Sequence, residues 1–169
     1  MSMSTMYASS VPQFKRMLQN LSEILKKAEG FAANMKIDPK VLLELRLFPD
    51  MFPLVRQVQI ASDQVRNGCA RIAGIELLKL EDNEQSFEEL QVRLSKTIEF
   101  LDKINPVQMD GTEQKEIKYS MGNHHFDYTA HLYLMTSIIP NFYFHVTTTY
   151  NILRHCGLEI GKGDYLGKK

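Results

Sequence analysis

The residues best suited to chemistry lie near the C-terminus, where polar side chains follow a helical spacing. Steps of four, three, four and three residues separate Asn141, His145, Thr148, Ile152 and His155. Side chains at these steps share one stripe of a helix, and such a stripe faces the interior when helices pack together. Because an unpaired buried polar group costs about 1–3 kcal/mol, these groups should be hydrogen-bonded or liganded. The spacing therefore predicts a polar pocket lined by His145, Thr148 and His155.

Two interpretations of this stripe are open. His145 and His155 can be core histidines that bond to a carbonyl or a carboxylate. Alternatively, Asn141 and His145, one turn apart, point into a shared pocket as the ligands of a helix-borne metal site do. An amide is a poor ligand for transition metals, so a metal held there would be bound weakly.

Other candidate ligands lie elsewhere in the chain. Gln57 falls beside the apolar stripe of a predicted helix, where it either faces the same pocket or lies at its boundary. Three histidines, His124, His125 and His131, fall within eight residues and could bind a metal. No paired HxxxH pattern supports that role, and we interpret them as part of a solvated loop.

Familiar catalytic motifs are absent from the sequence. Nothing matches a P-loop, a dinucleotide fingerprint, GxSxG or HExxH. Spacing alone defines no Ser-His-Asp or Cys-His arrangement. The residues therefore leave open whether the protein is an enzyme.

Amphipathic helices are predicted to position these residues, because apolar side chains recur at three- and four-residue steps. The predicted helices are residues 10–31, 50–74, 86–104 and 141–156. Ser10 with Gln13 and Ser86 with Glu89 match the capping-box spacing at two helix starts. Pro140 either kinks the last helix or starts it.

The segment before the last helix has a different pattern. Residues 116–121 alternate polar and apolar side chains, as a half-buried strand does, and Gly122 with Asn123 can form a turn. We therefore expect a long crossover or small hairpin before the last helix. The predicted fold is all-α: one domain, residues 1–169, forming an up-and-down four-helix bundle. The glycine-rich tail, residues 159–169, is expected to be irregular.

Gly68 interrupts an apolar stripe between Val65 and Ile72. A glycine at such a position lets a neighbouring helix approach closely. We therefore predict a tight helix–helix crossing at Gly68.

Composition limits the function classes. The 169 residues include 20 basic and 20 acidic side chains, and this net charge of zero argues against a general nucleic-acid or membrane-surface binder. No apolar run reaches the roughly 20 residues that span a bilayer. Cys69 and Cys156 form no CxxC motif, and we interpret them as free thiols in a reducing, cytoplasmic compartment. Zero net charge and the aromatics around the last helix favour a homodimer.

The segment from Pro140 to Gly157 resembles the last helix of the DinB-like superfamily. The order of four helices, with a hairpin-like crossover before the last, also resembles that fold. Residues Pro49 to Gln59, taken with Pro140 to His145, resemble a branch of the superfamily known only as a domain of unknown function. The resemblance covers nearly the whole chain.

This resemblance implies a divalent metal held by three histidines, one on the second helix and two in an HxxxH on the last. By register, His145 matches the second histidine of HxxxH, and Asn141 stands in place of the first. The helix of residues 50–74 contains no histidine, and Gln57 is its nearest candidate. Amides would then replace two of three ligands, which implies a degenerate site that holds zinc or nickel weakly.

Two functions remain open at this point. The first is a dimeric scaffold or binding module for a small molecule, with a degenerate metal site. The second, implied by relatives in the superfamily, is a metal-dependent transferase or isomerase that uses a low-molecular-weight thiol.

Overall fold

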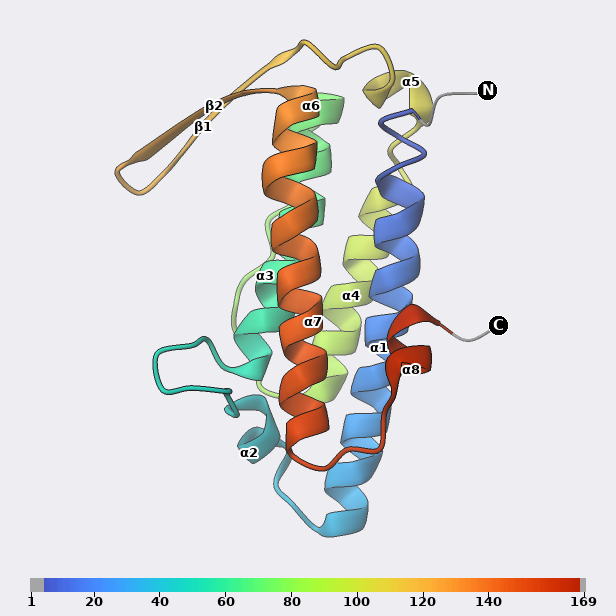
Figure 1. Cartoon of the computed structure of the whole chain (residues 1–169), viewed down its shortest axis with the longest axis vertical. Helices are drawn as coiled ribbons and strands as arrows, with labels where there is room; N and C mark the ends of the chain where they lie inside the picture. Colours follow the sequence, from blue (N-terminus) through green and yellow to red (C-terminus); the bar gives the residue numbers. More distant parts are fainter. Residues whose placement is uncertain (1–4, 168–169) are drawn as a thin grey trace.

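The protein is mostly helical and carries one small antiparallel sheet (Figure 1). The computed structural model describes residues 5–167. The elements are α1 (Val11–Met35), α2 (Pro39–Leu43), α3 (Leu54–Ala73), α4 (Phe87–Leu101), α5 (Pro106–Met109), β1 (Glu116–Met121), β2 (His124–Thr129), α6 (Ala130–Tyr133), η1 (Leu134–Ile138), α7 (Ile139–His155) and α8 (Lys162–Leu166). No helix in the described range is long and apolar enough to cross a membrane. The mostly helical class is as predicted, and the small hairpin lies where the alternating pattern predicted a strand and turn.

Local signals set several helix boundaries. The Ser86 side chain caps α4 by accepting a hydrogen bond from the Glu89 backbone N–H at 3.1 Å, as the capping-box spacing predicts. The same prediction is wrong for α1, because the Ser10 hydroxyl donates instead to the Met6 carbonyl at 2.6 Å. The helix nevertheless begins at the next residue, with a proline in its first turn.

The last long helix passes through Pro140 without interruption, since α6, η1 and α7 follow one another directly. The element η1 is a π-helix, and Pro140 lies in the first turn of α7 immediately after it. A proline ring inside an α-helix clashes with the carbonyl four residues earlier. We attribute the uninterrupted path to the π-helix, which alters the backbone spacing where that clash would arise.

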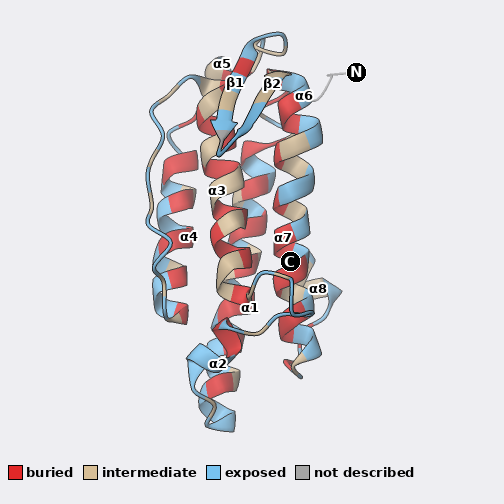
Figure 2. Ribbon diagram, turned by 90° about the vertical axis from the view of Figure 1, so that its left-hand side faces the viewer, coloured by how far each residue is buried: buried red, intermediate tan, exposed pale blue. Residues whose placement is uncertain are grey.

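Four long helices, α1, α3, α4 and α7, lie side by side and bury most of the apolar core (Figures 1 and 2). Phe14 of α1 and Phe142 of α7 are almost completely buried, and their rings meet edge to face at 5.1 Å. Burying each of these side chains contributes about 1.5–3 kcal/mol to the free energy of unfolding. Packing of these apolar faces therefore fixes how α7 is rotated about its own axis.

The predicted up-and-down order of the four helices is wrong. Contacts of α1 with α4 pair Lys15 with Asp102 and Ser22 with Gln91, so these two helices are antiparallel. In contrast, α3 and α4 run in the same direction (Figure 1), and their middle parts meet in the bond from Arg93 to Ser62. Figure 1 shows the reason: the segment after α3 runs back along that helix before α4 starts.

This segment, residues 75–85, is called the crossover below, and the buried Arg93 side chain anchors it. Arg93 Nη1 donates to the Glu81 carbonyl at 3.1 Å and to the Glu84 carboxylate at 2.8 Å. Its Nη2 lies 2.6 Å from Asp63 of α3 and 2.8 Å from Asp82 of the crossover. One guanidinium therefore joins α4, α3 and the crossover.

The C-terminal tail is more ordered than the sequence suggested. Residues 162–166 form α8, which packs against α1. The Asn20 side chain donates to the Tyr165 carbonyl at 3.0 Å, and Lys27 pairs with Asp164 at 2.6 Å. The expectation of an irregular tail is therefore wrong for this helix, while residues 168–169 lie outside the described residues.

The close crossing predicted at Gly68 is confirmed. A Cβ atom built on Gly68 would lie 2.5 Å from Cδ1 and 3.3 Å from Cγ2 of Ile138 in η1. We expect Gly68→Ala to lower the free energy of unfolding by about 1–3 kcal/mol through overpacking, with Gly68→Leu costing more. Urea denaturation measures this change.

Gly30 of α1 is the matched control, because a Cβ atom there would meet nothing within 4 Å. Gly30→Ala should raise stability by up to about 1 kcal/mol, since alanine is the better helix former. Equal effects of alanine at the two glycines would contradict the close crossing.

A second matched pair tests the crossover anchor. We expect Arg93→Met to lower the free energy of unfolding by about 3–5 kcal/mol, because its carboxylate partners lose their shared cation. Arg66 of α3 is equally buried, but its Nε and Nη1 have no hydrogen-bond partner within residues 5–167. Arg66→Met should therefore cost far less, and a larger loss for Arg66→Met than for Arg93→Met would refute the anchoring role.

Candidate functional site

The candidate site is built on a hydrogen bond between α3 and α7. Gln57 and His145 are both buried, and Gln57 Oε1 lies 2.7 Å from His145 Nδ1. Gln57 Nε2 donates to the Phe52 carbonyl at 2.9 Å, which fixes the amide orientation because a carbonyl can only accept. Gln57 Oε1 must therefore accept, and His145 Nδ1 must carry the proton. His145 Nε2 is left with a free lone pair.

The imidazole of His145 stays neutral over the physiological range. Burial, together with the smaller effect of the positive charge of Arg56, lowers the pKa of His145 from 6.5 to about 4. A neutral ring with its proton on Nδ1 presents Nε2 as a hydrogen-bond acceptor or a ligand atom. The ring is a weak base, since a base with so low a pKa is rarely protonated near pH 7.

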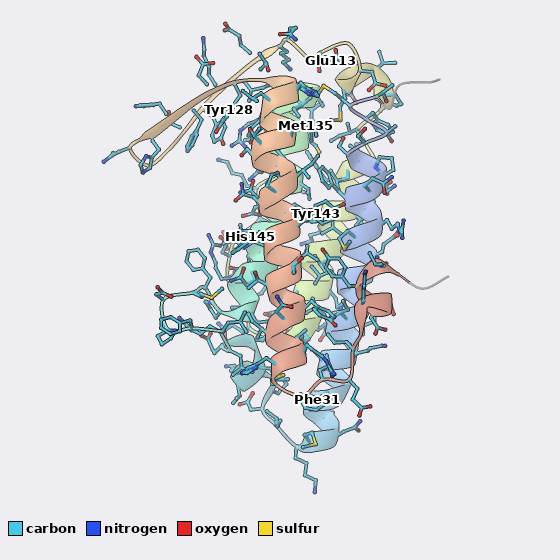
Figure 3. All side chains as sticks on the ribbon, in the orientation of Figure 1. Phe31, Glu113, Tyr128, Met135, Tyr143 and His145 are labelled. Carbon is cyan, nitrogen blue, oxygen red and sulfur yellow. The ribbon has the colours of Figure 1, made fainter. Side chains whose placement is uncertain are left out.

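His145 lines a cavity of about 440 Å³ that we call the α3 groove. Its walls are Phe52, Arg56, Ile60, Asp63, Gln64, Asn67, Arg71, Tyr119, Ser120, Tyr133 and His145. Most of these belong to one face of α3, and from Arg56 to Arg71 that face extends about 22 Å at 1.5 Å per residue. The hairpin lies in front of the far end of α3 in Figure 2, and Figure 3 shows His145 on the same side of the molecule. The groove is therefore long, with His145 at one end and the hairpin over the other.

The charges around the His145 end of the groove cancel. Asp63 pairs with Arg66 and Arg93, and Asp82 pairs with Arg56 and Arg93. Glu84 adds a third carboxylate to this network by pairing with Arg93. Three carboxylates thus face three guanidiniums. Arg71, at the opposite end, has no ion-pair partner in the part of the chain that the structure describes.

A further cavity of about 460 Å³ lies between the crossover and α4. Its lining is mostly charged and exposed, including Lys79, Glu88 and Lys96, and it contains none of the candidate site residues named from the sequence. We therefore treat the α3 groove as the candidate site.

Asn141 does not join His145 in the groove, which corrects the predicted stripe. Asn141 is exposed, and its Nδ2 donates to the Ser137 carbonyl at 2.7 Å. The large apolar side chains Phe142 and Val146 set the inward face of α7, and that face is centred about one residue later than predicted. Asn141 is consequently turned toward solvent.

The same rotation affects the two remaining residues of the predicted pocket. His155 is exposed, contrary to its predicted interior position. Thr148 is buried as predicted, but its hydroxyl donates to the Phe144 carbonyl at 2.7 Å, within its own helix. Neither residue lines the groove, so of the last-helix candidates only His145 does.

The three loop histidines do not gather into a site. His124, His125 and His131 are all exposed, and His125 Nδ1 lies 2.8 Å from the Ser120 hydroxyl. Of the residues that line the groove, the sequence reasoning singled out only His145, and those it missed include Arg71, Tyr119 and Tyr133. The position of Arg71 on the same face of α3 as Asn67 is visible from spacing. No pattern in the sequence indicates that the hairpin brings aromatic rings to Arg71.

The residues present do not fit the three-histidine metal site implied by the superfamily. Within residues 5–167 no group of three or more His, Cys, Asp or Glu side chains could hold a metal ion. Gln57 Oε1 bonds to the Nδ1 side of the His145 ring, while the free lone pair is on Nε2. These two atoms therefore cannot bind one ion in this arrangement, and Gln57 positions the ring instead.

Comparison with known proteins identifies the class and then the family. The chain is similar to the crystal structure of a DinB family member protein from Shewanella denitrificans, with 39% sequence identity and a TM-score of 0.86. The match covers 96% of this chain and 92% of that chain, and it confirms the DinB-like fold. Residues 6–166 match the family described as domain of unknown function DUF1993, and the chain belongs to that family. No curated protein matches the chain.

The lowered pKa of His145 predicts a pH dependence of stability. Between about pH 4 and 6.5 the unfolded chain binds more protons at this residue than the folded protein does. Its contribution to the free energy of unfolding is therefore fully present above pH 6.5 and is lost as the pH falls toward 4. His145→Gln should remove this part of the pH dependence in urea denaturation curves.

His155→Gln is the control, because His155 is exposed on the same helix. That variant should keep the slope of the parent between pH 4 and 6.5. Identical slopes for the parent and His145→Gln would contradict the neutral, buried state of His145.

Proposed function

We propose that the chain is a ligand-binding module whose α3 groove takes an extended polar molecule with a hydrogen-bond donor facing His145 Nε2. The observation that carries this proposal is the fixed tautomer of His145. His145 Nδ1 donates its proton to Gln57 Oε1, so Nε2 is the acceptor atom of a ring that lines the groove. A polar acceptor fixed at the wall of a long cavity is typical of a site that orients a ligand.

The geometry supports binding better than catalysis. An imidazole with a pKa lowered to about 4 is a weak base, and general acid–base catalysis works best with a pKa near the operating pH. A metal-dependent transferase or isomerase that uses a low-molecular-weight thiol remains the alternative. It would need a metal on His145 Nε2 with further ligands that residues 5–167 do not bring to the same place.

The remaining features are part of the same proposal. We propose one domain built as a four-helix bundle, with two parallel pairs of helices, acting in the cytoplasm without nucleic acid or membrane. A homodimer would cover three exposed apolar side chains of α6, η1 and α7, namely Leu132, Met135 and Phe144. Light scattering that gives the monomer mass at high micromolar concentration would rule out the dimer.

Zinc titration tests the degenerate metal site. Tight protein zinc sites use at least three strong ligands, and the groove offers one imidazole. We expect calorimetry to detect no zinc binding tighter than about the micromolar range. Asn141→His should bring no gain, because position 141 faces solvent. Nanomolar zinc binding by the parent protein would overturn this account of the site.

Ligand retention tests the binding function directly. The full chain is dialysed against a small-molecule extract of cells and then washed, and the retained compounds are identified by mass spectrometry. We expect the parent and the exposed control His155→Phe to retain the same compound, and His145→Phe to lose it because the larger ring fills the end of the groove. Retention that is equal in all three proteins, or absent from the parent, would overturn the proposal.

A further inference from the structure

The hairpin end of the α3 groove contains an arginine, Arg71, whose side chain is held in a fixed orientation. A ligand contact at His145 does not explain this arrangement. The Arg71 guanidinium lies over the Tyr119 ring of β1, with 4.4 Å from its Cζ to the ring centroid. Its Nη1 donates to the Tyr133 hydroxyl of α6 at 3.1 Å. Stacking and this hydrogen bond together fix the plane of the guanidinium.

Four of the five N–H donors of Arg71 are not used by these contacts. An arginine presents its donors as a planar fork, and the bond to Tyr133 occupies one edge of that fork. Arg71 is half-buried and lines the groove, so its other edge can face a bound molecule. A fork with fixed orientation matches the two oxygens of a carboxylate.

The charges near Arg71 do not neutralise it. Lys115 lies on the same side of the helix end, where its Nζ donates to the Arg71 carbonyl at 3.3 Å and to the Ile72 carbonyl at 2.8 Å. The hairpin carboxylates Glu116 and Asp127 pair with Lys118 instead, at 2.9 Å and 3.7 Å. Within the described residues, the hairpin end of the groove is therefore positive.

We propose that Arg71, Tyr119 and Tyr133 form a carboxylate-binding subsite at the hairpin end of the α3 groove. This inference deepens the proposed function and rests on it. Burial raises the pKa of the Tyr133 phenol, so its hydroxyl remains protonated beside the guanidinium. A single unpaired guanidinium matches a singly charged carboxylate better than a doubly charged phosphate.

The subsite also defines the shape of the ligand. Its carboxylate lies at Arg71, and its hydrogen-bond donor lies at His145, near the other end of a face about 20 Å long. Between them the groove presents the side-chain amides of Gln64 and Asn67, which can both donate and accept. The ligand class is an extended polar molecule with a carboxylate at one end, amide or hydroxyl groups along its length and a donor at the other end.

Acetate and acetamide test the subsite, because they have nearly the same shape and differ in charge. The full chain, labelled with ¹⁵N, is titrated with each compound at constant ionic strength. Acetate should shift the Arg71 Nε–H and Tyr119 amide signals and reach saturation, while acetamide at the same concentrations should not. Inorganic phosphate should bind more weakly than acetate.

Variants distinguish binding of acetate by the planar guanidinium of Arg71 from nonspecific attraction to a positive charge. Arg71→Met should abolish the saturable shift at Tyr119, and Arg71→Lys should weaken acetate binding at least tenfold, because it keeps the charge and loses the planar fork. Arg46→Met, on the exposed segment after α2, should bind acetate like the parent. Thermal unfolding of each variant establishes that it is folded.

Three results would overturn the subsite: no saturable shift with acetate, equal shifts with acetamide, or retention of the shift in folded Arg71→Met. Tighter binding of phosphate than of acetate would overturn the carboxylate assignment. If the proposed function is wrong but the subsite is right, acetate will still bind at Arg71, while the ligand-retention experiment will recover no compound from the groove. A recovered ligand without a carboxylate would support the groove and overturn the subsite.

Discussion

The buried guanidinium of Arg93 is the interaction on which the remaining architecture depends. It ties the middle of α4 to Ser62 and Asp63 of α3 and holds the crossover through Asp82 and Glu84. Because the crossover must return along α3 to reach it, α3 and α4 run parallel. The same network brings Asp82 to Arg56 in the groove wall. The charges near His145 are thereby balanced, whereas Arg71 at the other end of the groove has no ion-pair partner among residues 5–167.

The sequence predicted those features that depend on local pattern or on one strongly apolar face. The capping role of Ser86, the hairpin after α5 and the close approach at Gly68 all follow from spacing along single elements. The contact of His145 with Gln57 does not, because spacing left open whether Gln57 faces the pocket or its boundary. The direction of α4 could not be predicted in this way. An 11-residue connection allows α4 to run either parallel or antiparallel to α3, and a buried ion-pair network between distant residues selects the parallel arrangement. The predicted position of Asn141 was wrong for a related reason. Burial of the large apolar side chains Phe142 and Val146 sets the inward face of α7, and a stripe of polar residues does not.

The site shares one feature with a metal centre, an oriented histidine, but lacks a set of further ligands among residues 5–167. A histidine that ligates a metal commonly donates its other ring N–H to a second group, and Gln57 supplies that group here. The imidazole is thus held in a tautomer suited to binding through Nε2, while the described part of the chain brings no set of further metal ligands to it. We interpret the groove as one in which this orienting contact now serves a hydrogen bond to an organic ligand. In the proposed subsite, Arg71 at the far end would select for the charge of that ligand.

The fixed tautomer of His145 is the central claim, and ¹⁵N chemical shifts of its ring nitrogens test it most directly. Two-bond ¹H–¹⁵N correlation spectra recorded between pH 5 and 8 distinguish a protonated nitrogen from one with a free lone pair. The structure predicts a proton on Nδ1, a lone pair on Nε2 and no titration over this range, consistent with a pKa lowered to about 4. A proton on Nε2, or titration of the ring near pH 6.5, would contradict the account.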